Sequence, residues 1–193
     1  MDEQVLRAMA RWPDVPAVYG WLRLGPRAVW YLIDRGAPGF DPVRDADGSP
    51  ITSPPIIAFI NRNYQADAAG AWYWQNGPQR AYARLSLAPL CFRVIGDDGP
   101  LALLSHTGHV ASRIDEWLVD RDGNLYALTD VGPGVVDDRD LARLDPRESA
   151  DATVLALDMR DGHRVRVDLG TPHAPDAIAA RWGYLREPAP PAH

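Results

Sequence analysis

Two histidines, His106 and His109, form an H-x-x-H pattern and are the most direct candidates for metal chemistry. Imidazole nitrogens are common zinc ligands, and two histidines at this spacing can bind one ion. The pattern lacks the helical E-x-x-H context of zinc hydrolases, and no third ligand is evident. A metal-dependent hydrolase that uses these histidines with nearby Asp115 is therefore an alternative, whereas no metal and no other cofactor is predicted.

A second group of side chains suits molecular recognition better than bond making. Amides, guanidinium groups and aromatic rings follow the segment PPIIAFI and surround the turn of WYWQNGPQR. Such groups bind ligands through directed hydrogen bonds and stacking. The predicted ligand-binding residues are Asn61, Arg62, Asn63, Tyr64, Asn76, Gln79, Arg80 and Tyr82.

Each type of side chain in this group has a distinct expected role. Arg62 and Arg80 would hold an anionic or carbonyl group. Tyr64 and Tyr82 would stack on the ligand, and the amides would set its orientation. The alternative is structural, because buried amides often cap a helix or bind a hairpin to its neighbours. The sequence leaves both alternatives open.

The composition excludes several classes of enzyme. All 20 basic residues are arginine, which excludes Schiff-base and P-loop lysines. The chain has no G-x-S-x-G elbow and no glycine-rich phosphate loop between a strand and a helix. The single cysteine, Cys91, lies in the apolar segment PLCFRVI and is expected to be an inert core thiol. Nothing in the sequence raises the pKa of the acidic pair Asp137 and Asp138 towards acid-base work. No catalytic residue is predicted, and a non-catalytic function is favoured.

Charge and hydropathy narrow the range of partners and locations. The net charge of -6 argues against binding nucleic acid through its phosphates. No apolar run approaches the roughly 20 residues of a membrane span, and the first residues lack a signal-peptide pattern. We therefore expect a cytoplasmic protein that binds neither nucleic acid nor membranes, and that recognises a small polar ligand or a protein partner. A subunit that forms a homodimer through an exposed hairpin face is a third alternative.

An internal repeat predicts the elements that position these side chains. After a shift of 96 positions, GWLRLGPRAVWYLIDRG aligns with EWLVDRDGNLYALTDVG and five residues coincide. With the offset reduced to 84, GSPITSPPIIAFI aligns with GPGVVDDRDLARL, which places Ser53 and Asp137 at helix N-caps. The change of offset from 96 to 84 implies about twelve extra residues in the first copy near APGFDPVRDAD. This insertion is expected to be a surface loop.

A second hairpin follows in each copy, in AWYWQNGPQRAYARL and LALDMRDGHRVRVDL. In the first, Asn76-Gly77 predicts a two-residue type I′ turn that places Trp72 opposite Ala81. Trp72 and Trp74 then share one face and are expected to belong to the core. The core does not explain the opposite face, which carries Tyr73, Arg80, Tyr82 and Arg84.

Each copy therefore has the order strand-strand-helix-strand-strand. We predict an α+β protein of two pseudo-symmetric ββαββ repeats, with mainly antiparallel sheets and with helices at both ends. Residues 1–95 contain the N-terminal helix and the first repeat, and residues 96–193 contain linking strands, the second repeat and the C-terminal helix. A disordered tail is expected over residues 187–193. The two parts are expected to pack as one compact unit.

Two features together resemble known families: ITSPPIIAFINRNY leading to GAWYWQNGPQRAYARLSLAP, and the tandem ββαββ order. The whole chain resembles small proteobacterial proteins that form a family of unknown function. Over roughly residues 20–145, the order of elements is similar to that of another uncharacterised bacterial family, which has a repeated αβ-motif fold and a suggested role in signal transduction. The resemblance implies a repeat-built α+β fold and a binding or regulatory role, and it supplies no catalytic residues.

Overall fold

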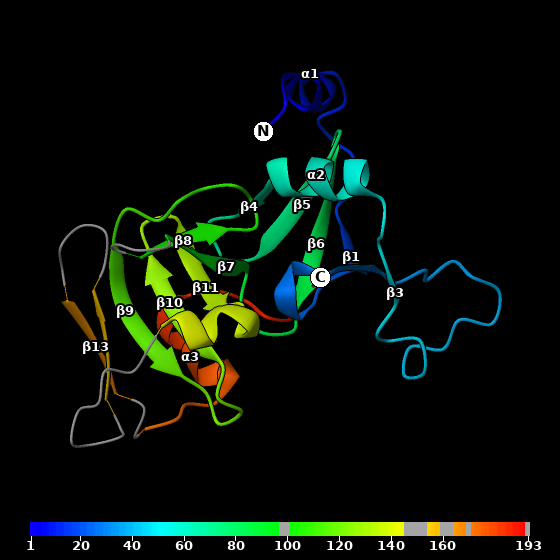
Figure 1. Cartoon of the computed structure of the whole chain (residues 1–193). Coiled ribbons are helices and arrows are strands. Elements are labelled where there is room, and N and C mark those ends of the chain that lie inside the picture. Colours follow the sequence, from blue (N-terminus) through cyan, green and yellow to red (C-terminus); the bar gives the residue numbers. More distant parts are fainter. Residues whose placement is uncertain (97–100, 145–153, 159–163, 169–170, 192–193) are drawn as a thin grey trace. The chain divides into compact units, whose positions relative to one another are not determined.

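Two compact units divide the chain, one formed by Met1–Ser86 with Gly183–His193 and the other by Leu87–Trp182. The structure is a computed structural model that describes residues 1–96, 101–144, 154–158, 164–168 and 171–191 (Figure 1). This division differs from the single compact unit and the boundary at residue 95 that the sequence suggested. The reason is that the strand beginning at Leu90 pairs with strands of the second unit.

The first unit is built on a six-stranded sheet. Its helices are α1 (Glu3–Arg11) and α2 (Pro54–Arg62), and a short 3-10 turn spans Pro26–Ala28. Its strands are β1 (Val18–Leu24), β2 (Trp30–Leu32), β3 (Ser49–Pro50), β4 (Tyr64–Ala66), β5 (Trp72–Asn76) and β6 (Gln79–Leu85). The strand order is β3-β2-β1-β6-β5-β4, and only β1 and β6 pair in parallel. That pairing joins two antiparallel runs of strands into one sheet.

Helix α2 lies across one face of this sheet, over β5 and its neighbours (Figure 1). Ile60 of the helix is fully buried, and the ring of Phe59 packs edge-on against Trp74 with 5.9 Å between ring centroids. Trp72, on the same face of β5, is also buried, whereas Trp74 and not Trp72 lies opposite Ala81. The prediction that the tryptophan face packs into the core is confirmed for Trp72, and the packing of Trp74 under the helix agrees with it.

The hairpin turn between β5 and β6 lies one residue further along the chain than predicted. The structure pairs Asn76 with Gln79, so the loop residues are Gly77 and Pro78. The Asn76-Gly77 turn is wrong because the N–H of Pro78 would have to close it, and proline has none. Gly77 instead takes a positive φ of 58° at the first loop position, as a type II′ turn requires. Strand partners move by two positions, so every side chain keeps its predicted face.

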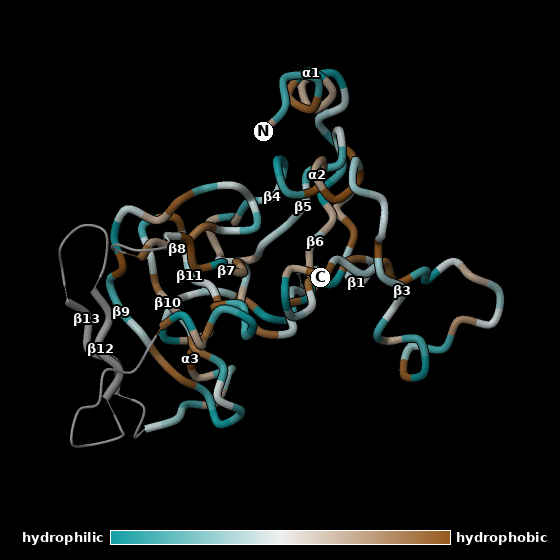
Figure 2. Tube along the Cα trace, viewed as in Figure 1, coloured by the Kyte–Doolittle hydropathy of each residue, from teal (hydrophilic) through white to brown (hydrophobic). Residues whose placement is uncertain are grey.

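Helix α1 is amphipathic, with hydrophobic and hydrophilic residues along the same short segment (Figure 2). Val5 is buried against the first unit, whereas Leu6 and Trp12 are exposed. Within the described parts of the chain, no helix combines the length and the apolar character that crossing a membrane would require.

The second unit is built on a five-stranded sheet. Its strands are β7 (Leu90–Ile95), β8 (Ala102–Ser105), β9 (Ile114–Val119), β10 (Leu125–Thr129) and β11 (Gly132–Val136). Their order is β8-β7-β11-β10-β9, with β7 and β11 parallel. Four further elements follow: the 3-10 helix η2 (Asp138–Arg143), the paired strands β12 (Val154–Asp158) and β13 (Arg164–Asp168), and helix α3 (Pro175–Trp182).

The predicted fold class is confirmed, because the chain is α+β with two similar, mainly antiparallel sheets and with helices near both ends. Each half has strands before and after a helix, but a third strand, β3 or β11, precedes the helix, and three strands follow α2 where two were predicted. Asp137 is the N-cap of η2. Strand pairing differs between the halves. In the first sheet, strand β6 of the β5-β6 hairpin pairs in parallel with β1. In the second sheet, the parallel partner of β11 is β7. Of the two strands expected to link the repeats, β7 therefore lies inside the second sheet and β8 forms one of its edges.

The end of the chain is better ordered than the sequence suggested. The amide of Leu185 donates to the carbonyl of Gly70 (3.0 Å), and the amide of Leu85 donates to that of Arg186 (2.8 Å). The expected disorder is wrong for residues 187–191, of which 187–190 line a cavity of the first unit. Prolines reduce the conformational entropy that this segment loses on ordering, which explains the difference. Residues 192 and 193 lie outside the described part.

The close parallel pairing of β11 with β7 predicts that one added methyl group at Gly134 destabilises the folded protein. A Cβ there would lie 2.9 Å from the carbonyl oxygen of Leu90 and would overlap the ring of Phe92. We expect Gly134→Ala to lower the free energy of unfolding by about 1–3 kcal/mol, measured by urea denaturation. The matched control is Gly36→Ala, where the added Cβ meets nothing closer than 3.6 Å. Equal urea midpoints for the two variants would contradict the close approach of β11 to β7.

Candidate functional site

The predicted residues at the end of α2 connect that helix to the start of α1. Asn63 is buried, its Oδ1 accepts from the amide of Asp2 (2.7 Å), and its Nδ2 donates to the carbonyl of Phe59 (2.9 Å). Arg62 pairs with the carboxylate of Asp2 at 3.2 Å. The hydrogen bond with Arg62 lowers the pKa of the Asp2 carboxyl most, and the one with Asn63 lowers it further. These contacts are those of the structural alternative, in which the polar groups fix one helix to another.

Asn61 and Tyr64 lie on the side of the sheet that α2 covers. The Oδ1 atom of Asn61 accepts from the indole N–H of Trp30 (2.8 Å). Tyr64 is buried edge-on against Trp30, with ring centroids 4.9 Å apart, and it also contacts Trp72. Burial raises the pKa of the Tyr64 hydroxyl well above its usual value. The ring of Tyr64 is therefore part of the aromatic core beneath the helix.

Residues of the hairpin lie on the opposite side or at the turn. Asn76 is exposed, and the Nε2 atom of Gln79 is 3.4 Å from the carbonyl of Pro16. The guanidinium of Arg80 lies over the ring of Tyr73, 4.8 Å from its centroid. Of the eight predicted residues, Asn61 and Arg62 belong to α2, Tyr64 lies on the sheet face beneath it, and Arg80 and Tyr82 lie on the opposite face. The structure does not bring them together.

Tyr82 lies on the sheet face away from α2 and is buried there with Tyr73. Its hydroxyl donates to Oδ2 of Asp67 (2.9 Å), and its ring stacks on Tyr19 at a centroid distance of 4.6 Å with 4° between the planes. Burial, with a further contribution from Asp67, raises the pKa of Tyr82 to about 12. Tyr73 and Tyr82 are buried on this face of the hairpin, whereas Arg80 on the same face is exposed, and the homodimer alternative stays a prediction.

The two histidines of the H-x-x-H pattern are not positioned as a pair of metal ligands. The Nδ1 atom of half-buried His106 accepts from the amide of Cys91 (3.2 Å), and His109 lies 3.1 Å from the hydroxyl of Thr107. Asp115 pairs with Arg113 at 2.6 Å. Among the residues that the structure describes, no group of three histidines, cysteines or carboxylates is arranged to hold a metal ion.

The acidic residues around η2 form ion pairs and are not available for acid-base work. Oxygen atoms of Asp137 and Asp140 each lie 2.5 Å from a guanidinium nitrogen, of Arg139 and Arg93 respectively. The hydrogen bond from Arg139 lowers the pKa of Asp137 to about 2, and that from Arg93 lowers the pKa of Asp140. Both carboxylates are therefore ionised near neutral pH, and the second one fixes η2 to β7.

A cavity on the Tyr82 side of the first sheet is the best candidate for a binding site. Its volume is about 280 Å³, and segments distant in the sequence line it: β1, the loop between β2 and β3, β6 and the end of the chain. The lining residues are Tyr19, Gly20, Ile33, Arg35, Phe40, Pro42, Ala46, Arg84, Glu187, Pro188, Ala189 and Pro190.

A β-bulge in β1 shapes one wall of this cavity. The pairing of β1 with β6 shifts register between Tyr19 and Leu22, and Gly20 has a φ of 73°. A Cβ at Gly20 would lie 2.5 Å from Nη1 of Arg35, so glycine leaves the space through which this guanidinium passes. The same Nη1 donates to the carbonyl of Tyr19 at 3.3 Å. The bulge therefore sets the positions of both a ring and a cation in the cavity wall.

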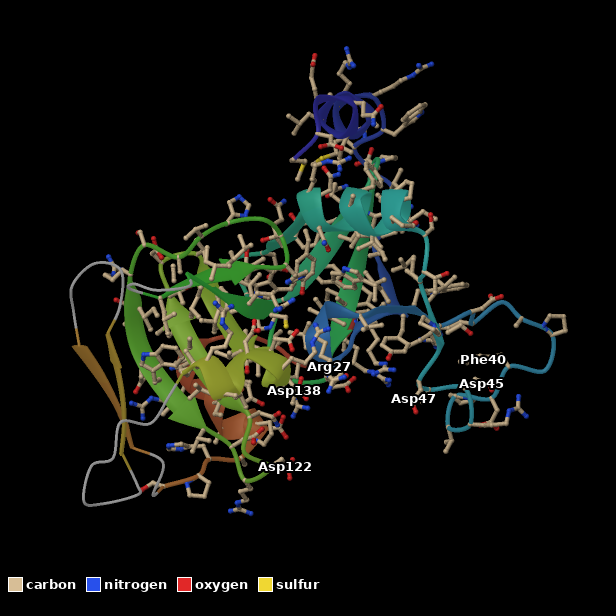
Figure 3. All side chains as sticks on the ribbon, viewed as in Figure 1. Arg27, Phe40, Asp45, Asp47, Asp122 and Asp138 are labelled. Atoms are coloured by element: carbon tan, nitrogen blue, oxygen red, sulfur yellow. The ribbon has the colours of Figure 1, made fainter. Side chains whose placement is uncertain are left out.

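The loop between β2 and β3, residues 33–48, forms the opposite wall and corresponds to the insertion predicted in the first copy. Nη2 of Arg84 donates to the carbonyl of Ala46 (2.5 Å), and Nη2 of Arg23 donates to that of Asp47 (2.8 Å). Figure 3 shows Phe40, Asp45 and Asp47 on this loop. Two arginines of neighbouring strands thus hold the loop to the sheet by hydrogen bonds to its backbone.

Arg35 and Arg84 supply the positive charge of the cavity. Within the described parts of the chain, no carboxylate lies within ion-pair distance of Arg35. Arg84 is 3.9 Å from Glu187, whose side chain is 76% exposed. A weakly held acid and an arginine without a carboxylate partner leave guanidinium N–H groups that can bind an anion.

Two features of the sequence point to parts of this cavity. Arg84 belongs to the hairpin face that the core did not explain, and the loop carrying Phe40 was recognised as an insertion. Tyr19 and Arg35 carried no local signal, since they approach the other lining residues only through the pairing of β1 with β6 and the return of the loop.

Comparisons with known proteins agree on a family without an assigned activity. A family model described as "Protein of unknown function (DUF2946)" matches residues 1–189. Among solved structures, the chain is similar to a DUF1285 family protein from Silicibacter pomeroyi DSS-3, with a TM-score of 0.53 and 15% identity, over 81% of this chain and 83% of that chain. At this identity the likeness shows the fold alone. No curated protein matches the chain. The two resemblances inferred from the sequence are confirmed.

Acidification is expected to destabilise the protein through His106. Burial lowers the pKa of this imidazole from 6.5 to about 4, so between these values the unfolded chain binds a proton that the folded protein does not. Stability should therefore fall as the pH is lowered from about 7 to about 5. His106→Asn should make this decline shallower in urea denaturation at each pH, whereas the exposed His109→Asn should leave it unchanged. Parallel pH profiles for wild type and His106→Asn would contradict this assignment.

Proposed function

The chain belongs to this family of proteins of unknown function, and we propose that it is a non-catalytic binding module whose first unit recognises a ligand with an anionic group. The observation that carries the proposal is the convergence of Arg35 and Arg84 on one cavity beside Tyr19. Guanidinium groups bind carboxylates and phosphates through paired N–H donors. The proposal places the binding site on the face of Tyr82 and Arg80, two of the residues predicted from the sequence.

Charge favours an anion over a cation in this cavity. Its lining carries two arginines and a single acid, Glu187, although the whole chain has a net charge of -6. Glu187 is the more exposed member of its pair with Arg84. An exposed pair of this kind contributes only about 0–1 kcal/mol to stability. An incoming carboxylate or phosphate can therefore replace Glu187 at low cost.

Shape and chemistry favour binding without catalysis. The volume of about 280 Å³ suits a metabolite-sized group or one or two side chains. One face of the Tyr19 ring is occupied by Tyr82, and the rest of the ring contributes an apolar surface to the cavity. The described lining includes no histidine, cysteine, serine or threonine that an adjacent base would activate.

A thermal-shift screen of carboxylates and phosphates at low ionic strength tests the proposal, since a ligand of the native state raises its apparent stability. For a compound that shifts the wild type, we expect Arg35→Ala and Arg84→Ala each to weaken binding about tenfold or more, as loss of a charge-assisted hydrogen bond does. Arg7→Ala, on the exposed side of α1, is the matched control and should bind normally. Unchanged affinity in the Arg35→Ala/Arg84→Ala double variant would refute the site.

Substitution of Gly20 tests the geometry without removing a charge. Gly20→Ala should weaken binding of the same compound, because the added methyl group displaces the guanidinium of Arg35. Gly123→Ala is the matched control: Gly123 also has a positive φ, of 83°, but no atom lies within 4 Å of its added Cβ. Both variants carry a similar backbone strain of about 1–2 kcal/mol, so their stabilities should be comparable. Equal affinity in the two variants, measured by isothermal titration calorimetry, would show that Arg35 does not contact the ligand.

A further inference from the structure

The segment from Leu185 to Pro190 contacts the rest of the first unit in the way that a bound peptide contacts its receptor. Leu185 forms a parallel bridge with Ala71. Its amide donates to the carbonyl of Gly70, and the carbonyl of Arg186 accepts from the amide of Leu85. Main-chain hydrogen bonds of this kind hold extended peptides at the ends and edges of sheets. This backbone pairing precedes the cavity, and the residues that follow it form part of the cavity wall.

Side-chain contacts continue the same pattern beyond Arg186. Glu187 approaches Arg84 at 3.9 Å, and Pro188, Ala189 and Pro190 follow it along the cavity wall. Aromatic residues, Tyr19 and Phe40, line the same cavity. Proline-rich segments bind to aromatic surfaces with a small loss of conformational entropy, because their extended backbone is already ordered. The cavity thus matches an acidic residue followed by prolines.

This segment is held loosely enough to be replaced. The side chain of Glu187 is 76% exposed, and Leu185 is 45% exposed. The segment nonetheless stays near the cavity because it is tethered, and a short tether gives an effective concentration on the order of millimolar. A free ligand must compete with this concentration, so weakening the internal contact increases its apparent affinity.

We infer that the partner of this site is an extended peptide in which an acidic residue precedes a Pro-x-Pro sequence, and that residues 185–190 of the chain are an internal occupant which this peptide displaces. The inference rests on the proposed function, since it uses Arg84 and the same cavity. It adds the class of ligand: the carbonyl of Gly70 and the amide of Leu85 are hydrogen-bonding groups that an extended backbone satisfies and an isolated small anion does not.

Fluorescence anisotropy with a labelled peptide, Leu-Arg-Glu-Pro-Ala-Pro-Pro, tests the inference on the full-length protein. In Glu187→Arg the internal segment is repelled by Arg84, and this variant should bind the peptide at least about tenfold more tightly than wild type. Arg113→Ala, which alters an exposed arginine of the second unit, should bind as wild type does. Affinities of Glu187→Arg and wild type within twofold of each other would overturn the role of the internal segment.

A charge exchange tests the contact with Arg84. The Arg84→Glu variant should bind the peptide above weakly. Its affinity should be at least about tenfold higher for the same peptide with arginine in place of glutamate. The Arg84→Gln variant should show a smaller difference in affinity between the two peptides than wild type does. Absence of this reversal in a folded variant would refute the pairing.

If neither peptide binds while a small carboxylate still raises the thermal stability of the wild type through Arg35 and Arg84, the peptide inference is wrong and the proposed function stands. If neither the peptides nor any anion binds, both are wrong.

Discussion

The parallel pairing of β1 with β6 is the contact on which the first unit depends. It joins two antiparallel runs of three strands into a six-stranded sheet. It also sets Tyr19 opposite Tyr82 and Arg23 opposite Arg84. The stacked rings, the two arginines that hold the loop and the bulge at Gly20 all follow from this one register. The candidate site is therefore a consequence of how the sheet closes.

Arginine side chains hold the loop between β2 and β3 against this face of the sheet, and the chain has no lysine. The guanidinium of Arg23 lies 3.9 Å from the ring centroid of Tyr31 while it donates to the carbonyl of Asp47. A planar group with several N–H donors can stack and donate at the same time, whereas an ammonium group cannot present two parallel donors. The loop between β2 and β3 has no long strand of its own, so these bonds to its carbonyls determine where it lies. Among the described residues, the nearby Arg35 has no carboxylate within ion-pair distance.

The second unit uses buried polar groups for support. Asp120 is buried and accepts from the amides of Asp122 and Asn124 and from the hydroxyl of Tyr126. Asp140 similarly joins η2 to β7 through Arg93. Buried carboxylates that are fully hydrogen-bonded specify how elements meet. The hydrogen bond from Arg93 lowers the pKa of Asp140 and so favours its ionised form. The contrast with the first unit is that there an arginine reaches a cavity without such a partner.

The sequence by itself determined the local elements and their faces. Alternation of Trp72 and Trp74 with Tyr73 identified the covered side of the hairpin, and a loop insertion with proline, glycine and aspartate identified where the first copy differs from the second. The turn at Gly77-Pro78 was also within reach of the sequence, because proline lacks the N–H that the alternative turn needs. These features depend on period, turn chemistry and capping, which act over a few residues.

Only the tertiary structure decided which strands pair and which side chains meet. Both halves have strands before and after a helix, yet β6 pairs with β1 in one sheet and β7 pairs with β11 in the other. The predicted site combined Tyr64 and Tyr82, which the pleat places on opposite faces, and omitted Tyr19 and Arg35, which come to the cavity from a neighbouring strand and a returning loop. Contacts between segments far apart in the chain depend on how apolar faces are covered and how loops close. A single sequence carries no local pattern for that choice, because many pairings satisfy the same periodicity.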